Sequence, residues 1–377
     1  MPDFSCELIN PEALDHYHWD ELIAGLPHAH VLQTAEWSQI KSQFGWQRQP
    51  VVWKDPQGSI RAAAMLLSRS ISIPVASRIL SFLYVPKGPM LDWSDMPLRQ
   101  QVLQDLESIA RSRRVVFIKI DPDVRLGTGL SAAQDSLGNK TGYAVVDALE
   151  RLGWRYSHEQ VQFKNTLQID LSNDQDQLLA RMKPKTRYNL RLAGRKGVKI
   201  RKGDIQDIPV LYRLYLETSV RDDFVIREQA YYEEVWSKFL ARDLADVFLA
   251  EVDGKAIAGL ILFRFAGKAW FLFGMSGSED REKMPNYLLQ WESILSLKAS
   301  GCKIYDLWGA PDEFIETDPL WGVYRFKEGL GGVTVRHIGA WDLPLRNSVY
   351  FLYSKILPAL LDWMRWRGKS RTRRQLA

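Results

Sequence analysis

Residues 247–273 read VFLAEVDGKAIAGLILFRFAGKAWFLF, and the architecture can be inferred outward from them. The apolar runs 247–252 and 256–265 flank Asp253-Gly254, and Asp-Gly between hydrophobic runs is a strong hairpin signal. A third apolar run, 269–273, follows after a second turn. The stretch therefore predicts three antiparallel strands in a meander.

The same order of elements occurs twice in the chain. After the meander, a helical pattern covers 286–299 and an apolar run covers 303–308. The first half offers matching segments, namely strands at 50–54, 60–67, 79–85 and 115–120 and a helix at 97–113. Both halves thus predict the order β-β-β-α-β, although an unrelated α/β protein could show that order by chance.

Three meandering strands followed by a helix and a strand form the back half of a GNAT-type acyltransferase fold. We therefore expect a mixed α/β protein with two tandem GNAT-like domains and a ligand cleft between them. The polar segment 136–142 lies near the expected boundary. The predicted division is a first domain at 1–156, a second domain at 157–338, and a helical segment with a basic tail at 339–377 that returns to the first domain.

Composition agrees with a globular protein of two domains. The chain has 377 residues, 46% hydrophobic and 25% charged. Cys6 and Cys302 are the two cysteines, which favours a reducing compartment over a disulfide framework. The first ten residues do not read as a secretory signal, and charges interrupt every long apolar run, so we expect a cytoplasmic protein.

The positive charge of the chain is concentrated in two segments. Ten basic residues and no acidic residue lie at 181–202, and six more lie at 365–377. Subtracting these sixteen charges from the net +5 leaves −11 for the remainder. In a predicted helix at 184–196, one stripe recurs every four residues: Lys183, Arg187, Arg191 and Arg195. Such a stripe suits the phosphates of a nucleic acid, with a solvated helix face as the alternative. Tyr188 and Leu192 are expected to anchor the helix.

Two loops bear on the acyl donor. A CoA-dependent acetyltransferase carries a Gly-containing phosphate loop after its fourth strand, whereas this chain has Gly274-Met275-Ser276-Gly277-Ser278-Glu279 in one half and Pro86-Lys87-Gly88-Pro89 in the other. Neither fits that loop. We expect a donor other than CoA, and no cofactor.

The chain resembles the Fem peptidoglycan aminoacyltransferases along most of its length. The resemblance rests on a series of motifs in one order: residues 33–37 with Lys41 and Trp46, 84–89, 183–198, 218–224, 286–292, 305–309 and 322–332. It implies two GNAT-like domains, an aminoacyl-tRNA donor that contacts the basic stripe, and an acceptor that is a nucleotide-linked or lipid-linked muramyl pentapeptide. The domain at 1–156 would then bind the acceptor, and the domain at 157–338 would carry out aminoacyl transfer on the tRNA side. The chain has no sustained heptad run, so it is similar to the compact members without a helical arm.

The resemblance also implies roles for individual residues. Lys327, after Phe326, matches the Phe-Lys pair of the family's active site, and its cation would stabilise the oxyanion of aminoacyl transfer. Lys41 and Arg221 match positions that hold the acceptor pyrophosphate, and Trp37 would stack on the uracil. Tyr84, Asp92 and the turn Lys87-Gly88-Pro89 are expected to line the rim of the cleft. Asp92 would also help to deprotonate the attacking amine. The structural alternatives are a surface Lys327 beside a buried Phe, a buried Trp37, and Asp92 as a turn residue.

Other chemistries find less support in the sequence. His16, His18, His28 and His30 form two His-x-His pairs, but no further ligands complete a metal site, so no metal is expected. A Gly-x-Ser-x-Gly nucleophile elbow is absent. Two alternatives to aminoacyl transfer stay open: an N-acyltransferase acting on another small amine or with another donor, and a noncatalytic RNA-binding or membrane-associated scaffold.

The C-terminal segment combines apolar residues with clustered arginine. Residues 348–366 include Phe351, Leu352, Trp363 and Trp366, and the basic run starts at Arg365. This pattern resembles a segment that lies on an anionic membrane surface, here the inner face of the cell membrane. The alternative is a helix packed on the first domain and followed by a frayed basic end.

Overall fold

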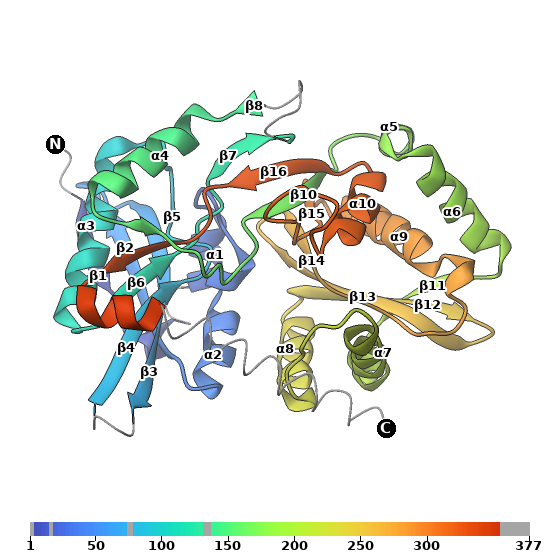
Figure 1. Cartoon of the computed structure of the whole chain (residues 1–377), viewed down its shortest axis with the longest axis horizontal. Coiled ribbons are helices and arrows are strands. Elements are labelled where there is room, and N and C mark those ends of the chain that lie inside the picture. The colour runs from blue at the N-terminus through green and yellow to red at the C-terminus, as the bar shows by residue number, and fades with distance from the viewer. Residues whose placement is uncertain (1–3, 15–17, 74–77, 131–136, 355–377) are drawn as a thin grey trace. The chain divides into compact units, whose positions relative to one another are not determined.

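The computed structural model describes residues 4–14, 18–73, 78–130 and 137–354, and this part of the chain forms two compact units (Figure 1). Unit 1 takes in the described residues up to Asn165 and those from Val335 onward, and unit 2 runs from Thr166 to Thr334. These borders fall near the predicted boundaries at 156 and 338. In this part of the chain, no helix is long and apolar enough to cross a membrane.

Unit 1 is built on a sheet with the strand order β1-β2-β3-β4-β6-β17-β9, and a short β5 pairs with β3. Its strands are β1 (Ser5–Leu8), β2 (Gln47–Lys54), β3 (Ile60–Ile73), β4 (Arg78–Val85), β5 (Met90–Leu91), β6 (Phe117–Ile120), β7 (Arg125–Thr128), β8 (Leu137–Gly138), β9 (Arg155–Tyr156) and β17 (Trp341–Pro344). Its helices are η1 (Pro11–Ala13), α1 (Trp19–Ala24), η2 (Val31–Gln33), α2 (Ala35–Gln43), α3 (Met96–Ser112) and α4 (Lys140–Arg151), and residues 347–354 are also helical. The strand β16 (Val333–His337), at the border of the units, pairs with β7.

The core of unit 1 follows from the alternation of its strands. Val51 and Trp53 share one core cluster with Leu103 and Leu106 of α3, and the Trp53 indole donates to Asp105 of α3 at 2.9 Å. Because side chains alternate between the faces of a strand, Val52 turns to the other face of the sheet. That face contacts α2, so helices cover both sides.

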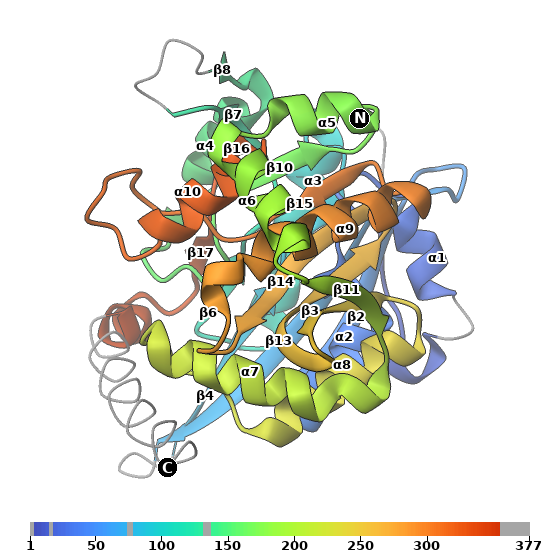
Figure 2. The ribbon, with the colours of Figure 1, turned by 90° about the vertical axis from the view of Figure 1, so that its right-hand side faces the viewer.

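Unit 2 repeats this plan with the strand order β11-β12-β13-β14-β15-β10. Its strands are β10 (Asn165–Asp170), β11 (Lys199–Gly203), β12 (Ala245–Val252), β13 (Lys255–Phe265), β14 (Lys268–Ser276) and β15 (Ile304–Asp306). Its helices are α5 (Gln175–Arg181), α6 (Pro184–Arg195), η4 (Ile205–Asp207), α7 (Ile208–Arg221), α8 (Gln229–Ala241), η5 (Arg281–Lys283), α9 (Pro285–Ala299) and α10 (Trp321–Gly329). In this unit α7 and α8 cover one face of the sheet, and α9 with α6 lies on the other (Figures 1 and 2).

The predicted hairpin of unit 2 is confirmed. Asp253 and Gly254 have φ of +49° and +79°, and β12 pairs with β13 from Val252 opposite Lys255. Positive φ at both central residues is the requirement of a type I′ turn, which Asp-Gly satisfies at little cost. On the face that α7 and α8 cover, Phe263 of β13 stacks on Phe239 of α8 with ring centroids 4.2 Å apart.

The predicted repetition of β-β-β-α-β is confirmed in both units. In unit 1, β2, β3 and β4 are antiparallel neighbours, α3 follows, and β6 returns parallel to β4. In unit 2, β12, β13 and β14 are antiparallel neighbours, α9 follows, and β15 returns parallel to β14. Each returning strand has an antiparallel partner on its other side, β17 in unit 1 and β10 in unit 2.

Candidate active site

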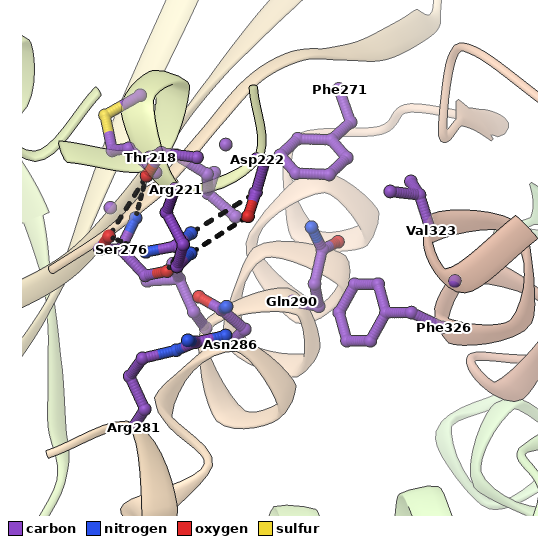
Figure 3. A pocket seen from close by; sticks show the side chains of 16 residues that line it. Thr218, Arg221, Asp222, Phe271, Ser276, Arg281, Asn286, Gln290, Val323 and Phe326 are labelled. Carbon is purple, nitrogen blue, oxygen red and sulfur yellow. Dashed lines mark hydrogen bonds and ion pairs between the residues drawn. The ribbon is translucent and has the colours of Figure 1, made fainter. Parts of the chain in front are cut away.

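A pocket of about 320 Å³ lies in unit 2 and is lined by α7, β13, β14, α9 and α10 (Figure 3). Its polar lining consists of Thr218, Arg221, Asp222, Ser276, Arg281, Asn286 and Gln290, and its larger apolar groups are Leu260, Phe271, Met275, Leu289, Val323 and Phe326. Apolar walls with a few placed polar groups are the usual form of a small-molecule site. The pocket is therefore the candidate active site of unit 2.

Arg221 stands at the C-terminal end of α7 and is fixed by β14. Its guanidinium donates to the carbonyl of Ser276 at 2.8 Å and to the Ser276 hydroxyl at 3.2 Å, while Nε pairs with Asp222 at 3.0 Å (Figure 3). Thr218, one turn earlier, accepts the N–H of Ser276 at 2.8 Å and ties the helix to the strand. The result is a positioned cation in the pocket wall, and an incoming phosphate would share it with Asp222.

Phe326 and Lys327 occupy the last turn of α10. Phe326 lines the pocket and makes an edge contact with Tyr287, with ring centroids 5.1 Å apart. Lys327 is buried, and its Nζ donates to the carbonyls of Trp308 and Gly309, each at 2.6 Å. The ammonium lies 6.0 Å from the ring centroid of Phe271, which lines the pocket.

The protonation of Lys327 is set by its surroundings. Burial lowers the pKa of Lys327 to about 7, while the carboxylate of Asp306 opposes that shift. The two carbonyl acceptors occupy two of the three N–H bonds of a protonated amine. The amine is therefore held on two sides, and the charge of the group changes near neutral pH.

The basic stripe of α6 divides in two. Lys183 pairs with Glu328 of α10 at 2.6 Å, and the backbone N–H of Lys183 donates to the carbonyl of Gly329 at 2.9 Å. The guanidinium of Arg187 donates to the carbonyls of Leu179, Ala180 and Met182, at 3.4, 3.2 and 2.6 Å, and so caps the end of α5. These two cations serve contacts within unit 2, whereas Arg191 and Arg195 are exposed.

Helix geometry explains this division. The buried positions of α6 are Thr186, Asn189 and Ala193. Each step of four residues advances about 400°, so the stripe rotates about 40° further from that face at every step. The expectation that Tyr188 anchors α6 is wrong, because this residue lies on the far side of the helix with 55% of its surface exposed, and the Arg195 guanidinium lies 5.9 Å from its ring.

Trp37 and Lys41 come together in unit 1, one turn apart on α2. The Nζ of Lys41 lies 4.2 Å from the ring centroid of Trp37, a cation–π distance. The helix begins at Ala35 because the Thr34 hydroxyl accepts the N–H of Trp37 at 3.3 Å. Only 8% of Trp37 is exposed, so little of the ring is open to a base.

Tyr84 and Asp92 lie in different surroundings within unit 1. Tyr84 is inside the unit, and its hydroxyl donates to the buried carboxylate of Asp121 at 2.7 Å. Asp92 is exposed and accepts the N–H of Ser94 at 2.9 Å and also its hydroxyl. These bonds lower the pKa of Asp92, which makes its carboxylate a weaker base. Their predicted roles toward substrate stay predictions.

Several pocket residues received no role from the sequence. Ser276, Asn286 and Gln290 line the pocket. Asp306 accepts the N–H of Trp308, in the turn whose carbonyls hold the Lys327 ammonium. The sequence pattern that could have identified two of them is a polar residue at the end of an apolar strand. Ser276 stands at the end of β14, and Asp306 stands at the end of β15.

The histidine pairs do not gather with other ligands. Among the described residues, no group of three or more His, Cys, Asp or Glu side chains is placed to hold a metal ion. His30 accepts the N–H of Leu32 at 3.0 Å through Nδ1, and its Nε2 lies 3.8 Å from Asp123. His16 lies outside the described residues.

Solved structures share the fold. A structure titled "Crystal structure of FemX" superposes with a TM-score of 0.80 at 19% identity and covers 93% of this chain and all of its own. A tandem GNAT protein from the clavulanic acid biosynthesis pathway matches with a TM-score of 0.52 at 13% identity, covering 91% of this chain and 98% of its own. Both units are GNAT-like.

Curated relatives match along nearly the whole chain. The lipid II:glycine glycyltransferases of Staphylococcus haemolyticus and of Staphylococcus aureus strain MRSA252 are each 21% identical, over 90% of this chain and 94% of theirs. The FemAB family matches residues 16–256 and 251–356. With the family covering most of the sequence, the chain belongs to the FemAB family.

Proposed function

We propose that this protein transfers an amino acid from aminoacyl-tRNA to the stem-peptide amine of a peptidoglycan precursor, a step of interpeptide bridge formation. Membership in the FemAB family and the names of the staphylococcal relatives support the reaction class and the kind of acceptor. The aminoacyl-tRNA donor is our inference, and the proposal covers both a nucleotide-linked and a lipid-linked acceptor.

The observation that carries the proposal is the buried ammonium of Lys327 behind the pocket wall. In the reaction, the acceptor amine attacks the ester carbonyl, the new C–N bond forms, and the C–O bond to the ribose breaks. The tetrahedral intermediate carries an oxyanion, which a fixed cation with a free N–H stabilises. The third N–H of Lys327 suits this role.

Proton transfer needs no dedicated base in this scheme. The attacking amine loses one proton as the amide forms, and the leaving ribose oxygen takes one up. Asp92 is a weak base with a lowered pKa, and its hydrogen bonds to Ser94 already engage it. We therefore propose that the proton passes from the amine to the leaving oxygen within the bound substrates.

The donor side of the proposal rests on α6. Its exposed cations Arg191 and Arg195, on the face that also carries Tyr188, suit the phosphates of tRNA. Lys183 and Arg187 belong to the predicted RNA contacts as well, and we assign them the task of holding this helix in place. This assignment follows from their bonds to Glu328 and to the end of α5.

The acceptor side of the proposal rests on the roles that the family resemblance implies for individual residues. Lys41 and Arg221 would hold the pyrophosphate, Trp37 would contact the uracil of a nucleotide-linked acceptor, and Tyr84 and Asp92 would contribute nearby. A lipid-linked acceptor would bring the protein to the cytoplasmic face of the membrane. In residues 347–354, Phe351 and Leu352 are 64% and 58% exposed, while the basic run at 365–377 lies outside the described residues.

Membrane contact is tested by sedimentation with vesicles. Full-length protein and a chain ending at Met364 are compared on anionic and neutral lipid at low and high salt. Binding to anionic lipid that is lost with salt and with truncation supports the contact. Equal recovery of both chains in the supernatant contradicts it.

The reaction is tested with muropeptide acceptors, charged total tRNA and mass spectrometry. We expect one aminoacyl mass to be added, the product to vanish with RNase, and CoA thioesters to have no effect. Transfer that survives RNase and needs a CoA thioester favours the N-acyltransferase alternative. RNA or membrane binding without any product favours the scaffold.

A further inference from the structure

Asp306 is the most heavily engaged carboxylate near the candidate active site. It ends β15, is 1% exposed, and receives donors from two neighbouring strands. Gln168 of β10 donates to Oδ2 at 2.9 Å, Lys268 of β14 lies 3.2 Å from the same oxygen, and Thr166 of β10 donates to Oδ1. The carboxylate is thus anchored at the centre of the sheet.

Asp306 also shapes the turn that follows. Its Oδ1 accepts the N–H of Trp308 at 2.9 Å. Trp308 has φ of +56°, a conformation that costs a non-glycine residue about 1 kcal/mol, and Gly309 has φ of +23°. This turn presents the two carbonyls that accept from Lys327.

We propose that Asp306 is a positioning residue that acts on Lys327 through the Trp308–Gly309 turn and through its own charge. The inference rests on the proposed function for its catalytic consequence. The geometry is a chain of contacts in which the carboxylate fixes the turn, the turn offers two carbonyls, and the carbonyls hold the ammonium behind the pocket.

The charge of Asp306 also favours the protonated form of Lys327, which the two carbonyls hold. Asp306 raises the pKa of Lys327, which burial lowers to about 7. Lys268, from β14, lies against the carboxylate and offsets part of its charge. On α10 itself, Glu328 is engaged by Lys183 and Arg325. Without the Asp306 charge, Lys327 would be largely neutral at pH 7 and would offer no cation to an oxyanion.

The test compares Asp306→Asn with Asp170→Asn. Asp170 is a matched control, because it ends β10 and accepts the N–H of Ser172, two residues on, at 2.9 Å, with no link to Lys327. Asn can still accept from Trp308, so the turn is kept while the charge is lost. The pKa of Lys327 is measured by NMR titration of protein labelled with ¹³C at lysine Cε, with the signal assigned by Lys327→Met.

We expect Asp306→Asn to lower the pKa of Lys327, to move the alkaline limb of kcat to lower pH, and to reduce kcat at pH 7 by about tenfold, with KM little changed. Asp170→Asn should match wild type in the pKa of Lys327, in the pH profile of kcat and in kcat at pH 7. Lys268→Met removes a cation beside Asp306 and should shift the pKa of Lys327 upward, which gives a second test if Asp306→Asn fails to fold.

The outcomes separate this inference from the proposed function. A Lys327 pKa that does not move in either Asp306→Asn or Lys268→Met overturns the positioning role, whatever the activity. If the pKa moves in the two expected directions and no charged tRNA supports transfer, the contact chain stands and the proposed function fails.

Discussion

The two units share one topology but differ in how they use the end of the strand that follows the crossover helix. In unit 1, Asp121 follows β6 and accepts from the Tyr84 hydroxyl and from the N–H of Lys87, and the Lys87 ammonium pairs with Asp123 at 2.9 Å. In unit 2, Asp306 ends β15, and the nearby Lys327 has backbone carbonyls as its hydrogen-bond acceptors. Lys87 is thus paired with a carboxylate, whereas Lys327 is held by carbonyl dipoles beside a pocket.

The difference teaches that burial alone does not make a lysine reactive. A directly paired ammonium stays charged and holds the fold together, because separating the pair would strand a buried carboxylate. An ammonium held by carbonyls has a pKa lowered by burial and can change charge near neutral pH. The same substitution in the two units should therefore have different consequences.

The largest effect is expected from Lys87→Met. It leaves the Asp123 carboxylate, whose side chain is only 12% exposed, without its ammonium partner, so the free energy of unfolding should fall by about 3–5 kcal/mol. Urea unfolding followed by tryptophan fluorescence measures it. Lys54→Met removes a half-exposed partner of Glu7 and should cost less than about 1 kcal/mol. Equal losses in the two variants would contradict the structural role of Lys87.

Lys327→Met should affect turnover instead of folding. Met keeps the apolar stem and deletes the cation, so kcat should drop about 10²–10³-fold, or roughly 3–4 kcal/mol, with no loss of unfolding free energy. Lys298→Met is the control, since Lys298 of α9 also donates to a backbone carbonyl, that of Leu171 at 3.0 Å. A folded Lys327→Met protein with turnover within about threefold of wild type rules out the oxyanion role.

Asp121 should make the stability of the protein depend on pH. Burial raises its pKa to about 6, above the value near 4 of an unfolded chain. The folded state therefore holds this proton more tightly, and the contribution of Asp121 to stability is lost as the pH rises from about 4 to about 6, on the order of 2–3 kcal/mol. The free energy of unfolding of wild type and of Asp121→Asn, measured at pH 4.5 and 7, isolates the contribution of Asp121. Parallel pH dependence in the two proteins would exclude it.

The smallest effect is expected on α6. Replacing Arg191 and Arg195 together with Ala should flatten the salt dependence of tRNA binding by about two phosphate equivalents. Arg187→Ala should leave that slope unchanged and lower stability by about 1.5–3 kcal/mol, because its charged donor caps α5. If Arg187→Ala changes the slope and the double variant does not, the division of the stripe is wrong.

Most of the fold could be predicted because its signals are local. The Asp-Gly turn, the apolar runs and the helix 184–196, observed as α6 (Pro184–Arg195), each depend on a few neighbouring residues. The pairing of β17 beside β6 could not be read from the sequence, because it joins segments far apart in the chain and depends on packing.

The candidate site was predictable only in part. Phe326 and Arg221, carried over from the family resemblance, both line the pocket. The partners of Lys327 could not be foreseen, because they are backbone carbonyls that face it only in the folded turn. The stripe on α6 divides into engaged and exposed cations for a geometric reason, since a four-residue spacing does not stay on one face of a helix with 3.6 residues per turn.

The bonds of Lys183 to α10 mechanically couple two parts of unit 2. Lys183 begins α6 and is joined through its side chain to Glu328 and through its backbone to Gly329, the two residues that follow Lys327. A ligand that pulls on the start of α6 must either carry the end of α10 with it or break both bonds. If occupancy of the exposed α6 surface shifts the end of α10 in this way, it also changes the placement of the Lys327 ammonium. By reciprocity, a substrate that fixes Lys327 would then change the affinity of that surface by the same factor.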